Sequence, residues 1–268
     1  MKAGQAYIFL LVLFTACSQY EKLLKSADYD LKYRKAFEYY HKRDYERAAT
    51  LFEQINTVYR GSLKGDSVNF YLADSYFKQE DYLMAAESFK LFEETYSRSP
   101  FAERAAYLKN YCYYKLSPRP ELDQENTRIA MAGLELFMVK YPQSEYIPDC
   151  KRLMAELREK LIEKSYLNAM LYYKTEHYKA AIVALRNSLN QYPDSKYREE
   201  IKFTLLKSCY LLADRSVPEK RKERFQDAMD EYFSFVDEYP KSHYRKEADK
   251  IYRQCMAVLG NEKNNEKE

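Results

Sequence analysis

The chain has 268 residues, of which 46% are hydrophobic and 32% are charged, and its formal net charge is +3 at pH 7. Because acidic and basic residues are interspersed and nearly balanced, nothing marks the chain as a nucleic-acid-binding protein. Only 5 Gly and 8 Pro occur against 29 Tyr and 14 Phe, which argues against a turn-rich β fold and favours helices. The only close glycine pair, Gly61 and Gly65, follows no predicted strand, which excludes a Gly-rich phosphate-binding loop.

The first residues, MKAGQAYIFLLVLFTAC, have the features of a bacterial secretion signal. Lys2 supplies the positive charge, and the apolar stretch from Tyr7 to Phe14 is too short to span a bilayer as a helix. The small residues before Cys17 resemble a lipobox, so we expect Cys17 to be acylated and to become the mature N-terminus; the alternative is an ordinary signal peptide with an incidental cysteine. Several acyl chains would hold the protein at a membrane, and we expect the periplasmic face of the outer membrane.

A Tyr-x-x-Ser motif recurs through the rest of the chain and is clearest as YPQSEY, YPDSKY and YPKSHY. An alanine lies eleven residues before each tyrosine, and a large apolar residue lies seven before it. The tyrosines are Tyr59, Tyr96, Tyr141, Tyr192 and Tyr239, the serines are Ser62, Ser99, Ser144, Ser195 and Ser242, and the alanines are Ala48, Ala85, Ala130, Ala181 and Ala228. Five registers that agree at several columns indicate a repeat array.

These columns have helical spacing and form one stripe, in which alanine permits close approach of a neighbouring helix. The helix is expected to end at the tyrosine, often before a proline that disfavours its continuation, and the serine to cap the next helix. A preceding helix carries a small residue and a tyrosine three later, as in Ala36 and Tyr39. The pattern resembles tetratricopeptide repeats, with periods of 37, 45, 51 and 47 residues against about 34 in the usual repeat.

The sequence therefore predicts an all-α fold: a superhelical array of about five degenerate tetratricopeptide-like helix pairs with a C-terminal capping helix at about 243–259. The expected segments are a signal peptide at 1–16, a lipidated N-terminal linker at 17–27, repeats 1–3 at 28–141, repeats 4–5 and the capping helix at 142–259, and a disordered tail at 260–268.

A second stripe on the first helix of each pair carries aromatic residues, although a concave face that meets only water should be polar. The candidate peptide groove consists of Tyr33, Phe37, Tyr40, Phe70, Asp74 and Phe77, and the fourth repeat has Tyr166, Met170 and Tyr173 at matching positions. Such a face favours binding of an extended peptide with aromatic side chains. The alternative is that the rings pack against the next repeat or are covered by the segment 18–30.

Chemistry-bearing residues form no recognisable site. His41, His177 and His243 fall in expected surface turns, without metal-ligand spacing. The compartment permits disulfides, yet Cys112, Cys150, Cys209 and Cys255 lie within helical patterns without CxxC spacing, so we expect buried free thiols. No nucleophile motif occurs. We therefore expect a protein that is not an enzyme, with no catalytic residues, no metal and no cofactor.

The stretch from Tyr141 to Ile182, with its YPxSxY, Arg152-Leu153 and Tyr172-Tyr173, resembles the BamD family of outer-membrane β-barrel assembly lipoproteins, as does the opening CSQYEKLLKSADYDLKYRKAFEYY. The resemblance implies a scaffold that docks on the periplasmic POTRA domains of a BamA-like barrel-forming subunit. Its first repeats would receive unfolded outer-membrane protein precursors, and its later repeats would dock, alongside other assembly lipoproteins. Membrane contact would be through the lipid anchor only.

The docking candidates that accompany this resemblance are Arg152, Tyr166, Met170 and Tyr173. Two arginines of some family members fall here at Glu176–His177 and at Ala184, which puts contacts through those positions in doubt. The main rival is a periplasmic tetratricopeptide adaptor lipoprotein for cell-wall or envelope-constriction machinery. Such adaptors often begin with a coiled coil, and CSQYEKLLKS is too short for three heptads. A lipid-anchored hydrolase would need a further catalytic domain, and a glycan-capture lipoprotein is disfavoured by the absence of Trp.

Overall fold

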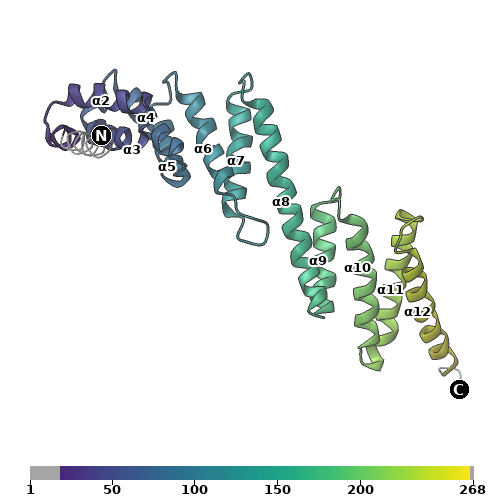
Figure 1. Cartoon of the computed structure of the whole chain (residues 1–268). Coiled ribbons are helices and arrows are strands. Elements are labelled where there is room, and N and C mark those ends of the chain that lie inside the picture. Colours follow the sequence, from purple (N-terminus) through teal and green to yellow (C-terminus); the bar gives the residue numbers. More distant parts are fainter. Residues whose placement is uncertain (1–18, 266–268) are drawn as a thin grey trace, which may run out of the picture. The chain divides into compact units, whose positions relative to one another are not determined.

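The computed structural model describes residues 19–265, with side chains described through residue 260, and this part of the chain contains helices and turns but no strand. A short helical segment at residues 19–25 precedes the main helices (Figure 1). These are α2 (Tyr29–His41), α3 (Tyr45–Tyr59), α4 (Gly65–Lys78), α5 (Tyr82–Thr95), α6 (Ala102–Leu116), α7 (Glu125–Lys140), α8 (Ile147–Lys174), α9 (Tyr178–Gln191), α10 (Arg198–Asp214), α11 (Pro218–Glu238) and α12 (Arg245–Asn265). The predicted signal peptide and Cys17 lie outside the described residues.

Consecutive helices form five pairs, from α2–α3 to α10–α11, and α12 follows the last pair. This confirms the predicted all-α class with tetratricopeptide-like pairing. The chain divides into two compact units. Unit 1 comprises the described residues up to Pro118 together with Gln124–Leu157, and unit 2 comprises Arg119–Asp123 together with the described residues from Arg158 onward. The helix α8 therefore contributes its first part to unit 1 and the rest to unit 2.

The predicted alanine column lies at the centre of each pair. All five alanines, Ala48, Ala85, Ala130, Ala181 and Ala228, have 0% exposure. One turn further on, the large apolar residues Phe52, Phe89, Leu134, Leu185 and Tyr232 are also buried. A methyl side chain lets the two helices of a pair approach closely, and the larger neighbour fills the space that the methyl group leaves.

The Tyr-x-x-Ser motif forms the turn between one pair and the next. In the fourth copy Tyr192 is the C-cap of α9, and the Ser195 N–H donates to its carbonyl at 3.1 Å. The Ser195 hydroxyl then accepts from the N–H of Tyr197 at 3.1 Å, and α10 begins one residue later. The same contacts recur in the other copies. The serine therefore organises the turn ahead of the helix and is not itself the helix N-cap, which corrects the expectation.

The four described cysteines, Cys112, Cys150, Cys209 and Cys255, are free and buried, as predicted. Burial raises the pKa of Cys112 and Cys209 to about 12 and that of Cys150 and Cys255 to about 11. Because the thiolate is the reactive form of cysteine, these thiols are inert in the folded protein.

Both ends of the described chain contain helix where the sequence predicted a linker and a disordered tail. Within the expected linker, residues 19–25 are helical and pack on the first pair. At the other end, α12 continues to Asn265, into the expected tail, because the residues after Gly260 include good helix formers and no proline. No helix within residues 19–265 is both long enough and apolar enough to cross a membrane.

Three turns between paired helices place a residue other than glycine in the left-handed region: Arg43 (φ 63°), Glu80 (φ 63°) and Glu176 (φ 62°). A side chain with a Cβ atom pays roughly 1 kcal/mol there, and glycine does not. We expect Glu80→Gly to raise the free energy of unfolding by about 0.5–1 kcal/mol, seen as a higher urea midpoint with an unchanged slope. Lys151→Gly, inside α8, should instead cost about 1 kcal/mol; two changes of the same sign would contradict this account.

Glu238 at the end of α11 accepts hydrogen bonds from Arg198 and Lys202 of α10. These bonds lower the pKa of Glu238 to about 2. Its ion pairs therefore stabilise the fold above the ordinary glutamate pKa of about 4.3, and this contribution disappears as the pH falls towards 2. We expect Glu238→Gln to lower the free energy of unfolding by ~1 kcal/mol at pH 7, and the difference to vanish near the pKa of the folded carboxyl. Glu223→Gln on the same helix serves as the control and should change the free energy of unfolding at pH 7 by less than about 0.5 kcal/mol.

Candidate functional site

Each junction between repeats stacks a residue of one repeat on a ring of the repeat before it. The stacking residue comes two positions after the motif serine, and its partner lies on the first helix of the preceding pair. The stacked pairs are Phe101 on Phe70 at 4.5 Å, Tyr146 on Tyr107 at 4.2 Å, Tyr197 on Tyr166 at 4.1 Å and Tyr244 on Phe203 at 4.3 Å between ring centroids. At the first junction the Lys64 ammonium lies 4.7 Å from the centroid of the Tyr33 ring. The second stripe of aromatic residues is therefore used largely for packing.

At the two junctions where a tyrosine stacks on a tyrosine, an acid on the first helix of the next pair accepts a hydrogen bond from the hydroxyl of the partner ring. Tyr107 donates to Asp149, and Tyr166 donates to Glu200. Burial and these bonds raise the pKa of both phenols, which stay protonated and remain donors. Each acid lies three residues after the stacking aromatic, so one turn of helix supplies both contacts.

The groove prediction is wrong for Phe70 and Asp74, both of which have 0% exposure. Asp74 accepts from the Tyr40 hydroxyl and lies 3.8 Å from the Arg104 guanidinium, while its Oδ1 has no hydrogen bond within the described residues. These contacts link the first helices of three successive pairs, since Tyr40 is on α2, Asp74 on α4 and Arg104 on α6. The buried carboxylate is a packing feature of unit 1 and is closed to a ligand.

The other groove candidates are partly buried by their neighbours. The Phe37 ring lies 5.0 Å from those of Phe52 and Tyr71, between α3 and α4. Phe77 lies against Tyr82 and against Tyr111 of the next pair. The alternative expectation, that the rings pack against the next repeat, therefore describes most of this face. Tyr33, Tyr40 and Phe77 keep partly exposed edges.

The docking candidates also separate into buried and exposed groups. Arg152 is exposed, but its guanidinium is paired with Asp149 and with Glu156, the latter at 2.6 Å. Met170 is buried, with an exposed fraction of 9%, so it packs in the core and presents almost no surface. Tyr166 is half-buried in its stack on Tyr197. Tyr173, packed against Tyr178, is likewise only partly exposed.

The structure has a pocket of about 840 Å³ in unit 2 that the sequence did not predict. The end of α8, the first turns of α9 and the end of α10 form it. Its lining residues are Tyr172, Glu176, His177, Tyr178, Lys179, Ala180, Val183, Ala184, Asn187, Leu212 and Arg215. The walls are mainly apolar, and Val183 is 56% exposed within them. We call this the α8–α10 pocket.

The rim of the α8–α10 pocket is polar and fixed in place. Arg215 pairs with Glu176 at 2.7 Å, and its guanidinium lies 5.0 Å from the centroid of the Tyr178 ring. The bond to Arg215 lowers the pKa of Glu176. An apolar floor within a charged rim is the ordinary anatomy of a surface that binds protein side chains.

One sequence signal could have found the pocket. Nine residues before the motif tyrosine the repeats carry Thr50, Glu87, Ala132, Val183 and Asp230. Val183 is the one large apolar residue in this water-facing column, and an exposed apolar residue at such a position indicates an interaction surface.

Side chains that could bind a metal ion do not cluster in the described part of the chain. Among those residues, no group of three or more His, Cys, Asp or Glu is arranged to hold a metal ion. His41, His177 and His243 are exposed, as predicted. The surfaces described above provide packing contacts and ion pairs, which suit binding of another protein.

The fold defines a class: an all-α scaffold of tetratricopeptide-like helix pairs, here with an apolar pocket in unit 2. The chain belongs to the YfiO family, described as outer membrane lipoprotein, whose family model matches residues 26–223, well over half of the chain. This confirms the resemblance seen in the sequence.

Two curated relatives carry matching names. "Outer membrane protein assembly factor BamD" of Caulobacter vibrioides is 26% identical over 117 residues, which is 44% of this chain and only 38% of that relative. "Putative outer membrane protein assembly factor BamD" of Aquifex aeolicus is 25% identical over 244 residues, 90% of this chain and 79% of the relative. Among solved structures, a TPR repeats protein from Bacteroides fragilis aligns over 87% of this chain and 100% of its own, with a TM-score of 0.40 and 13% identity.

The junction stacks should dominate the stability of unit 2. Tyr197→Ala removes the ring that lies on Tyr166, and we expect a loss of about 2–3 kcal/mol in the free energy of unfolding. Tyr172→Ala removes a ring of the same size that is 45% exposed, and it should cost under about 1 kcal/mol. Urea unfolding followed by circular dichroism measures both; equal losses would contradict the role assigned to the stack.

Proposed function

We propose that the chain is a non-enzymatic lipoprotein scaffold of the outer-membrane β-barrel assembly machinery, anchored through Cys17 at the periplasmic face of the outer membrane. It docks on the POTRA domains of the barrel-forming subunit and receives unfolded barrel precursors. Membership of a family of outer membrane lipoproteins supports this, as do two relatives that are named assembly factors.

The observation that carries the proposal is the α8–α10 pocket. Its volume of about 840 Å³ is enough for two or three large apolar side chains of a folded partner. Val183, Ala184 and Leu212 supply the floor, and Lys179 stands at the rim, where it can pair with an acidic group of the partner. We assign POTRA docking to this pocket in place of Arg152 and Met170, because the arginine is already paired and the methionine is buried.

Precursor reception is assigned to unit 1. The partly exposed edges of Tyr33, Tyr40 and Phe77 offer aromatic contacts to an extended chain. Phe70 and Asp74 support this face from below, since Phe70 holds the junction stack and Asp74 holds the Tyr40 hydroxyl. The binding would be weak and tolerant of sequence, as suits a scaffold that passes its cargo on.

Placing a charge in the pocket tests the proposal. We expect Val183→Glu to reduce co-purification of a POTRA-containing barrel subunit with the tagged, detergent-solubilised chain by about tenfold or more, because a carboxylate would be buried against the apolar floor. Val58→Glu changes an equally apolar residue that is 49% exposed on α3, and it should leave co-purification unchanged. Both variants should keep the helical circular dichroism of the parent.

Two results would count against this assignment. If the parent chain brings down cell-wall or envelope-constriction proteins and no POTRA-containing subunit, the adaptor function replaces the assembly function. If the parent captures the barrel subunit and Val183→Glu captures it equally well, docking lies elsewhere on the chain.

A further inference from the structure

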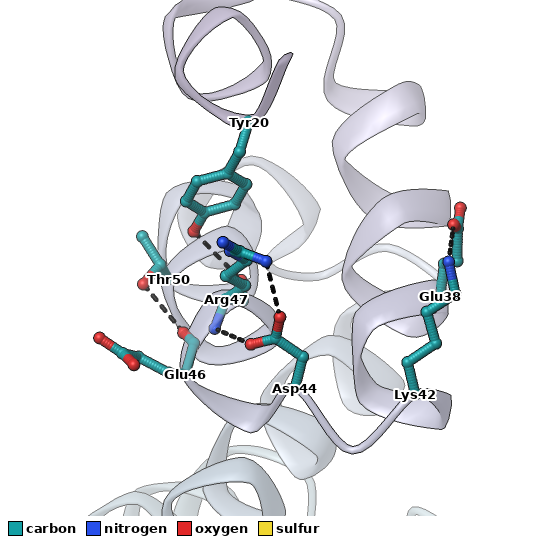
Figure 2. A network of polar contacts seen from close by, with 7 residues as sticks. All are labelled: Tyr20, Glu38, Lys42, Asp44, Glu46, Arg47 and Thr50. Atoms are coloured by element: carbon teal, nitrogen blue, oxygen red, sulfur yellow. Dashed lines mark hydrogen bonds and ion pairs between the residues drawn. The ribbon is translucent and has the colours of Figure 1, made fainter. Parts of the chain in front are cut away.

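The helical segment at residues 19–25, here called the anchor segment, is docked on the first helix pair. The Tyr20 ring meets the Tyr39 ring edge to face at 5.6 Å, and Leu23 and Leu24 pack on the core between α2 and α3. Figure 2 shows the Tyr20 side chain pointing from this segment towards Arg47 at the start of α3. The segment that follows the expected lipid anchor is therefore part of the folded repeat.

Arg47 fastens the start of the anchor segment. Its carbonyl accepts from the Tyr20 hydroxyl at 3.5 Å, and its guanidinium lies 5.1 Å from the centroid of the Tyr20 ring and 5.7 Å from that of Tyr39. Asp44, the N-cap of α3, holds the same guanidinium at 3.0 Å (Figure 2). A cation held between two rings by a fixed carboxylate is a preorganised contact.

Lys32 fastens the other end. This lysine is only 5% exposed, and its ammonium donates to the Leu24 carbonyl at 3.0 Å and to Gln54 Oε1 at 2.7 Å. Lysine is almost never buried without a partner, because its charge must be compensated. Here part of that compensation comes from the Leu24 carbonyl at the end of the anchor segment. The hydrogen bond therefore satisfies a polar group of the segment and a buried charge of the first pair at the same time.

We propose that the anchor segment rigidly couples the lipid anchor to the first helix pair and so holds that pair directly against the lipid surface. The inference rests on the acylation of Cys17 in the proposed function. Only residue 18 separates Cys17 from the segment, and two residue steps span at most about 7 Å. A free linker over all of 17–27 would instead let the first pair move roughly 20 Å from the anchor.

The charge of the anchor segment fits a bilayer as its partner. Lys22 and Lys25 are exposed, lie three residues apart and therefore share a face. Neither forms an ion pair with another residue of the described chain, so both are available to the phosphates of lipid headgroups. Basic side chains beside a lipid anchor add to membrane attachment.

Proteolysis of the acylated full-length chain on vesicles of phosphatidylethanolamine and phosphatidylglycerol tests the docking. Trypsin cleavage after Lys22 or Lys25 releases the repeats from the vesicles, and it requires the docked segment to open first. We expect slow release from the parent and about tenfold faster release from Tyr20→Ser. Leu136→Ser, which removes an apolar side chain that is 65% exposed on α7, should match the parent. Rapid release from the parent, or no acceleration in Tyr20→Ser, would overturn the proposal.

A tether-length experiment tests the position at the membrane. A fluorophore is attached at Ala27→Cys, and the four native thiols stay unlabelled because they are buried in the folded protein. Quenching by headgroup spin-labelled lipid should fall several-fold when a 15-residue Gly-Ser spacer is inserted between residues 18 and 19. Equal quenching with and without the spacer would refute the proposal, as would a mature chain without acyl groups on Cys17. Neither result depends on capture of the barrel subunit, so a failure here is distinct from a failure of the docking function.

Discussion

The stack of one aromatic ring on another, found at four of the five repeat junctions, is the contact on which the rest of the structure depends. A helix pair buries its alanine stripe between its own two helices, but that contact does not determine the position of the next pair. The ring delivered two residues after the motif serine supplies this information, because two stacked rings fix both a separation and an orientation. Tyr197 on Tyr166 and Tyr244 on Phe203 illustrate the rule. Stability then accumulates between neighbours, as in other repeat proteins.

This use of aromatic residues determines which surfaces are left for function. The aromatic face that the sequence predicted as a peptide groove is largely occupied by packing at the repeat junctions. Phe70 and Asp74 are buried beneath it. An exposed apolar surface remains where an apolar residue occupies a column that is usually polar. Val183 is such a residue, and with Leu212 and Tyr172 it opens the α8–α10 pocket. The pocket to which we assign docking therefore arises from a departure from the repeat pattern.

Two buried polar side chains in unit 1, those of Lys32 and Asp74, hold neighbouring helices in position. Lys32 joins the anchor segment to α2 and α3, whereas Asp74 joins the first helices of three successive pairs. A buried charge stabilises a fold poorly in net terms, because desolvation offsets the attraction. Its effect is to disfavour arrangements in which the partner is missing. Both residues thus help to select one packing of the N-terminal helices.

The sequence by itself determined the helix pairs, their ends and their buried stripe. Periodic alanines and the Tyr-x-x-Ser turns are local signals, and local hydrogen bonding and close helix approach depend only on residues nearby in the chain. It also determined the family, because the motifs span most of the chain. Tertiary structure alone decided whether Phe37, Phe70 and Tyr166 face a ligand or the next repeat, since a ring's partner lies thirty or more residues away. For the same reason, only the tertiary structure reveals the α8–α10 pocket and the docking of residues 19–25. Each is formed by side chains from separate helices, and no local sequence pattern predicts that these side chains come into contact.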